Sequence, residues 1–91
     1  MKSEQDRDQE GSIDEPPADP LSILSERQLQ VLRLVARGLT NKQVASELGL
    51  SVYTVETHMK NIFAKLKVPN RGAAIRFAID NKIDEPRKRR R

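Results

Sequence analysis

Apolar residues recur at helical spacing in four stretches between residues 25 and 81, and each stretch has the start and stop signals of a helix. We find no segment with the two-residue alternation of a half-buried strand. The pattern therefore predicts an all-α fold of four helices. Residues 40–66 combine a short helix, a glycine turn and a longer amphipathic helix, which is the order of a helix-turn-helix.

The first two predicted helices each begin with a capping box, in which an N-cap hydroxyl and a glutamine three residues later bond each other's backbone. The pairs are Ser25 with Gln28 and Thr40 with Gln43. Gly38 and Gly49 follow the two helices, because glycine adopts the left-handed backbone at a helix end without a side-chain clash. The expected inward residues are Leu29, Leu32 and Val35 or Ala36 in the first helix, and Val44, Ala45 and Leu48 in the second.

The third predicted helix, about residues 52–67, follows the N-cap candidate Ser51 and has a regular apolar stripe. It ends at Val68-Pro69, because a residue before proline avoids the α region. The fourth helix follows Asn70 and runs from Arg71 to about Asn81. The expected inward residues are Val55, Met59, Ile62 and Leu66, with Phe63 beside them, in the third helix, and Ala74, Phe77 and Ala78 in the fourth.

Charge divides the chain into three segments within a net charge of +4. Residues 1–20 hold seven acidic side chains against two basic ones and too few apolar residues to form a core, so we expect an acidic disordered segment. Residues 85–91 form a second disordered tail, which is basic. The folded domain is expected at residues 21–84, where ten basic side chains exceed the acidic ones and favour a polyanionic partner.

Composition excludes several classes of protein. The chain has no cysteine, so disulfides and thiolate metal sites are ruled out. No apolar run approaches the ~20 residues of a membrane helix, and the acidic N-terminus lacks the apolar core of a signal peptide. We therefore expect a cytoplasmic protein that is not bound to a membrane.

The third helix carries the candidate chemistry on the face opposite its apolar stripe. A helix advances ~100° per residue, which brings Tyr53, Thr57, Lys60, Asn61 and Ala64 to that face and Glu56 to its flank. Small side chains allow close approach to base edges, and lysine donates to guanine. The small Ala45 and the glycine of the turn let the two helices cross closely, as a major-groove reader requires. This face is therefore predicted to contact DNA bases.

Enzyme chemistry has no support in the sequence. His58 is the single histidine, and without cysteine it supplies too few ligands for a metal. No carboxylate pair or Ser-His-Asp arrangement is apparent. We expect no catalysis, cofactor or metal, and interpret His58 as a packing residue or a hydrogen-bonding group on the phosphate side.

Residues 24–78 resemble the DNA-binding domain of the LuxR-type transcription regulators, also called the GerE- or NarL-like family. The block Thr54-Val55-Glu56-Thr57-His58 followed by Lys65-Leu66 and Arg71 is its most specific part. The other matching residues are Leu24-Ser25, Arg27, Val31-Leu32, Leu34, Ala36, Gly38-Leu39, Asn41-Lys42, Val44-Ala45, Leu48, Ser51, Ile62 and Val68.

The resemblance implies a transcription regulator that binds a two-fold-related DNA site as a homodimer through the fourth helix, where we select Ile75 and Ile79. It implies base contacts by Glu56, Thr57 and Lys60, to which Asn61 is added because it shares their face. Phosphate contacts are implied for Lys42, Thr54, Lys65 and Arg71, with His58 as a further candidate. Two residues depart from the family: Gln28 stands where glutamate is usual, and Glu56 where several members carry lysine.

Two alternatives stay open. The opening Leu24-Ser25-Glu26-Arg27 is also compatible with a promoter-reading region of a sigma factor, which makes RNA polymerase a candidate partner. A helical module that binds an acidic protein is the other, and residues 1–20 provide an acidic segment within the chain. Residues 1–23 are too few for the sensor domain of most relatives, so we expect a stand-alone regulator or an excised output domain.

Overall fold

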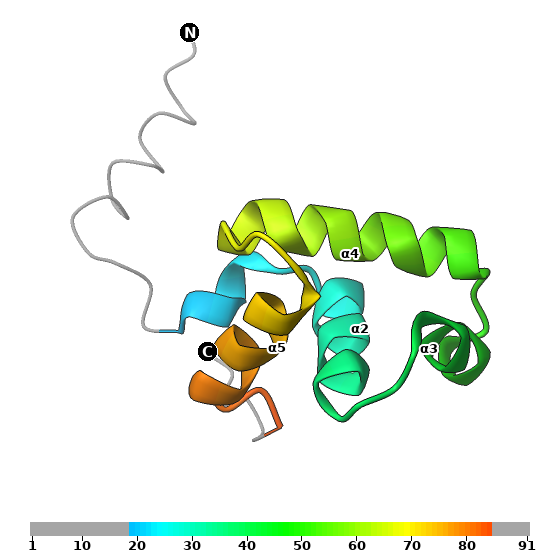
Figure 1. Cartoon of the computed structure of the whole chain (residues 1–91), viewed down its shortest axis with the longest axis horizontal. Coiled ribbons are helices and arrows are strands. Elements are labelled where there is room, and N and C mark those ends of the chain that lie inside the picture. The colour runs from blue at the N-terminus through cyan, green and yellow to red at the C-terminus, as the bar shows by residue number, and fades with distance from the viewer. Residues whose placement is uncertain (1–18, 85–91) are drawn as a thin grey trace, which may run out of the picture.

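The computed structural model describes residues 19–84, which form a short 3-10 helix and four α-helices (Figure 1). The elements are η1 (Pro20–Ile23), α2 (Glu26–Ala36), α3 (Asn41–Leu48), α4 (Val52–Leu66) and α5 (Arg71–Asp80). No strand occurs in this part of the chain, and the predicted all-α fold is confirmed. Helix α4 runs along one side of the molecule, with α3 near its beginning and α5 near its end (Figure 1).

Each α-helix begins directly after the polar N-cap residue that the sequence indicated. The side chain of the N-cap residue accepts a hydrogen bond from the backbone N–H three residues later at Ser25, Thr40, Ser51 and Asn70. Both predicted capping boxes are complete, because the glutamine side chains accept bonds from the N-cap backbone in return. These bonds satisfy N–H groups that lack a partner within the helix.

Each α-helix also ends in the same way, with a residue in the left-handed region followed by an apolar residue. The N–H of the apolar residue donates to the carbonyl five residues before it, which satisfies a terminal carbonyl. The left-handed residues are Gly38, Gly49, Lys67 and Lys82. The bonds are Leu39 to Leu34, Leu50 to Ala45, Val68 to Phe63 and Ile83 to Ala78. Helix α4 thus ends at Leu66 with Lys67 as its C-cap, just before the Val68-Pro69 pair from which its end was predicted.

The buried surface of α2 is wider than the apolar stripe predicted for this helix. Leu32 and Val35 are buried as expected, but Leu29 and Ala36 are only half-buried, whereas Val31 is fully buried. The reason is that α2 packs against α3, α4 and α5, so more than one stripe of its surface is covered. The predicted stripe of α4 is buried in full, while Leu48 and Phe77 are half-buried at the edge of the core.

The first described element begins at Pro20, one residue before the expected domain of residues 21–84. Asp19 caps η1 by accepting from the N–H of Leu21, and Leu21 is fully buried. Asp19 and Pro20 thus belong to the start of η1, whereas the sequence pattern places them at the end of the acidic segment. The remaining expectations for that segment, and those for the basic tail, lie outside the described residues.

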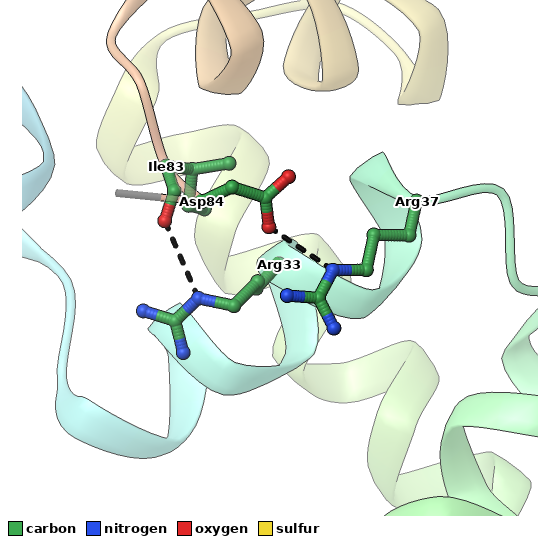
Figure 2. Close-up of polar contacts among 4 residues, drawn as sticks. All are labelled: Arg33, Arg37, Ile83 and Asp84. Atoms are coloured by element: carbon green, nitrogen blue, oxygen red, sulfur yellow. Dashed lines mark hydrogen bonds and ion pairs between the residues drawn. The ribbon is translucent and has the colours of Figure 1, made fainter. Parts of the chain in front are cut away.

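Arg33 of α2 and Arg37, the C-cap residue of that helix, hold the turn that follows α5 (Figure 2). Arg33 Nε donates to the carbonyl oxygen of Ile83 at 3.3 Å, and Arg37 Nε lies 3.0 Å from Asp84 Oδ1. Ile83 itself is buried in the core, so the turn is fixed by both packing and polar contacts. The Arg37–Asp84 pair is half-exposed and contributes little free energy, because water screens it.

Candidate nucleic-acid interface

Helix α4 is held by one face and presents the other to solvent. Val55, Met59, Ile62 and Leu66 are buried against the other helices. The opposite face is exposed, and its aromatic residue Tyr53 has 76% of its surface accessible. The exposed residues of this face and its flank are Tyr53, Glu56, Thr57, Lys60, Asn61 and Ala64. All four residues that we predicted as base contacts are thus accessible on one helix.

Two threonine hydroxyls in the first half of α4 bond to a neighbour in the helix or at its N-cap. The Thr57 hydroxyl donates to the Tyr53 carbonyl oxygen at 3.2 Å. This bond uses the one O–H donor of Thr57, and its methyl group is left for an apolar contact. Thr54 is half-buried, and its hydroxyl oxygen accepts from the Ser51 hydroxyl at 2.9 Å. Thr54 is therefore a fixed polar group at the start of the helix.

The beginnings of α3 and α4 favour an anion. Neither helix has an acidic residue in its first turn, so no carboxylate offsets the positive end of its dipole there. Lys42 lies exposed in the first turn of α3, which packs against α4. His58, by contrast, is half-buried on the flank of α4.

Two predicted phosphate contacts have partners inside the domain. Lys65 Nζ donates to Gln28 Oε1 at 3.0 Å, which joins the last turn of α4 to the first turn of α2. Arg71 donates to Asn41 Oδ1 at 2.8 Å and to the Leu39 carbonyl oxygen at 2.7 Å. Sequence reasoning missed both links, because nothing in the local pattern pairs residues that are so far apart along the chain.

The predicted dimer residues differ in exposure. Ile79 on α5 is 56% exposed, which is unusual for a large apolar side chain, whereas Ile75 is half-buried. Ile23 of η1 is also exposed, at 45%, and no pattern in the sequence indicated it. These positions make α5 and η1 the candidates for a protein contact.

Residues 19–84 contain no group of three or more His, Cys, Asp or Glu side chains arranged to hold a metal ion. Within the same part of the chain, no helix has the length and apolar character needed to cross a membrane.

Residues 22–78 match the family of bacterial regulatory proteins called the luxR family. The nitrate/nitrite response regulator protein NarP of Escherichia coli (strain K12) is 52% identical over 56 residues, which cover 62% of this chain and 26% of NarP. The oxygen regulatory protein NreC of Staphylococcus aureus (strain bovine RF122 / ET3-1) is 40% identical over 68 residues, which cover 75% of this chain and 31% of NreC.

A solved structure agrees with these relatives. The crystal structure of the response regulator ChrA, from a heme-sensing two-component system, resembles this chain with a TM-score of 0.62 and 33% identity. The similarity covers 87% of this chain and 37% of ChrA, so the chain spans well under half the length of these relatives. The matched family residues run from η1 to α5 and include the whole helix-turn-helix, α3 and α4. The chain therefore belongs to the luxR family of bacterial regulatory proteins, and its helices form a DNA-binding helix-turn-helix domain.

Proposed function

We propose that this chain binds a specific, two-fold-related DNA sequence as a homodimer and thereby regulates transcription. The observation that carries the proposal is the division of α4 into a buried apolar face and an exposed polar face. A helix that is held by its inner face can enter the major groove, which is wide enough for it, and present its outer side chains to the bases. Such binding would occur in the cytoplasm, where bacterial DNA lies.

The four predicted base contacts offer different chemistry to the groove. Lys60 donates to guanine O6 and N7, and the Thr57 methyl contacts a thymine methyl. Asn61 suits adenine, and the Glu56 carboxylate accepts from cytosine N4. The Thr57 contact fits the structure well, because its hydroxyl donor is taken up by the Tyr53 carbonyl.

The phosphate contacts proposed for Lys42, Thr54, His58, Lys65 and Arg71 rest on unequal support. Lys42 and Lys65 are exposed, whereas the other three are half-buried. The internal bonds of Arg71 leave part of its fork of donors for a phosphate, since a guanidinium has five N–H groups. We assign α5, with Ile75 and the exposed Ile79, to the dimer contact.

The family match favours this proposal over the sigma-factor and acidic-partner interpretations. Contact with RNA polymerase stays a prediction, as does the direction of regulation. NarP and NreC are named for nitrate or nitrite and for oxygen, but the matched region is only 26–31% of their length. We therefore transfer neither signal to this chain.

Selection from a random duplex library tests the proposal. We expect enrichment of two related half-sites, bound at least ~10³-fold more tightly than random DNA. Enrichment of a single half-site would contradict the homodimer. A steep salt dependence without any enriched sequence would contradict specific recognition, because phosphate contacts alone produce that result.

Variants of α4 test the base contacts. Lys60→Ala and Thr57→Ala should each reduce the preference for the selected site over random DNA by about 1–3 kcal/mol, which is the range for one base contact. Lys42→Ala is the control, because a lost phosphate contact should weaken binding to both duplexes equally. Unchanged discrimination in both α4 variants would show that α4 does not read the bases.

A further inference from the structure

Gln28 is the one buried polar or charged residue among residues 19–84, with 7% of its surface exposed. Its side-chain oxygen accepts from the Ser25 backbone N–H at 3.0 Å and from Lys65 Nζ at 3.0 Å. A carbonyl oxygen has two lone pairs, so these two bonds use its full capacity. The side chain therefore links the start of α2 to the end of α4.

The partner of Lys65 in this arrangement is a neutral amide. It is exposed in the last turn of α4, one turn after Asn61 and on the flank of the exposed face. Its ammonium has three donors, of which one bonds Gln28. Neither of the ion pairs that the structure describes within residues 19–84 involves Lys65. A neutral acceptor thus holds the group in place and leaves two N–H donors and a full positive charge for another partner.

We propose that Gln28 is a positioning residue for DNA binding, which fixes the Lys65 ammonium at the end of the recognition helix without neutralising it. The inference rests on the proposed function, because it takes a DNA phosphate as the second partner of Lys65. A glutamate at position 28 would keep the capping acceptor but place a negative charge at hydrogen-bond distance from the ammonium. That charge would compete with the phosphate for Lys65, whereas the amide oxygen of Gln28 does not.

The test measures how the affinity of the full 91-residue chain for its selected duplex depends on salt. Each phosphate contact adds about one to the slope of log affinity against log salt. We expect Lys65→Met to lower the affinity at low salt and to reduce that slope by about one per protomer. Gln28→Glu should also lower the affinity at low salt and reduce the slope, because its carboxylate would pair with the Lys65 ammonium in competition with the phosphate.

The double variant isolates the pair. In a Lys65→Met background, Gln28→Glu should leave the salt slope unchanged, because there is no ammonium left to neutralise. A purely structural role of Gln28 would not produce this pattern, since damage to the fold would lower affinity in either background. Urea unfolding of each variant supplies the readout of stability.

Gln43→Glu is the matched control for capping. It makes the same substitution at the same position of the capping box of α3, where Gln43 Oε1 accepts from the Thr40 N–H at 2.8 Å. The hydrogen bonds described for residues 19–84 give Gln43 no lysine donor. We expect Gln28→Glu to raise the urea midpoint more than Gln43→Glu does, because only the first change creates an ion pair.

The outcomes separate this inference from the proposed function. If Lys65→Met reduces the salt slope but Gln28→Glu does not, the inference about Gln28 is wrong and the phosphate contact stands. If Lys65→Met leaves the slope unchanged while specific binding persists, Lys65 contacts no phosphate and the inference also fails. If the unmodified chain binds no DNA sequence selectively, the proposed function fails together with it.

Discussion

The left-handed residues at the helix ends are of two kinds. Gly38 and Gly49 adopt this conformation without strain, whereas Lys67 and Lys82 carry a Cβ there, at φ values of 59° and 54°. The left-handed region costs a residue with a side chain about 1–2 kcal/mol. The apolar residue that follows each lysine, half-buried Val68 in one case and buried Ile83 in the other, offsets this cost by packing against the core.

We predict that two glycine-to-alanine substitutions act in opposite directions. Gly49→Ala should destabilise the domain by about 1 kcal/mol, because φ is +68° there. The added Cβ would meet nothing within 4 Å, so the cost is conformational rather than steric. Gly72→Ala, within α5, should stabilise by about 0.5 kcal/mol through helix propensity. Urea unfolding measures the change in stability of each variant, and a change in the same direction for both would contradict this explanation.

At the scale of elements, Arg71 connects the candidate dimer helix to the helix-turn-helix. It is the first residue of α5, and its guanidinium reaches the first residue of α3, Asn41, and the Leu39 carbonyl before it. Two short bonds from one planar group fix both direction and distance, which a lysine ammonium cannot reproduce. Arg71 therefore links α3 directly to α5, in addition to the packing of both helices against α2 and α4.

Arg71→Lys should lower the free energy of unfolding by about 1–2 kcal/mol, because charge-assisted bonds to half-buried acceptors are lost. Arg76→Lys on the same helix is the control. Arg76 Nε lies 3.7 Å from Asp80 in an exposed pair, so its substitution should change stability by less than about 0.5 kcal/mol. A similar loss in both variants, measured by urea unfolding, would show that the links to α3 do not stabilise the domain.

The sequence predicted the elements well because their signals are local. Caps, glycine stops and the apolar stripe of α4 all act within a few residues, and the helices follow them closely. The same stripe indicated which face of α4 is exposed. The links Lys65–Gln28 and Arg71–Asn41 join residues 37 and 30 positions apart, and only the packing of the helices brings them together.

Residues from both ends of the domain complete its hydrophobic core. Leu21 and Leu24 enter the core from the N-terminal side and Ile83 from the turn after α5. Helical periodicity does not reveal such residues, because they lie outside the α-helices. The turn lies on the side of the bundle away from α4, so it completes the core without approaching the exposed face (Figure 1).

Ile83→Ala should therefore destabilise the domain by about 2–4 kcal/mol, since it removes a buried side chain and leaves a cavity. Ile79→Ala makes the same chemical change at a position that is 56% exposed, and should change stability by less than about 0.5 kcal/mol. Thermal and urea unfolding of the monomer at low concentration compare the two. If Ile83→Ala were as mild as the control, the turn would not belong to the cooperative unit.

The separation of α4 into a buried and an exposed face bears on how such domains evolve. Its inner face carries the packing, and the side chains at Glu56, Thr57, Lys60 and Asn61 lie outside the core. Exposed positions of this kind accept most substitutions at little cost in stability. Under the proposed function, in which these side chains read the bases, a lineage of such domains could therefore exchange one target sequence for another through a few mutations, without first acquiring extra stability to tolerate them.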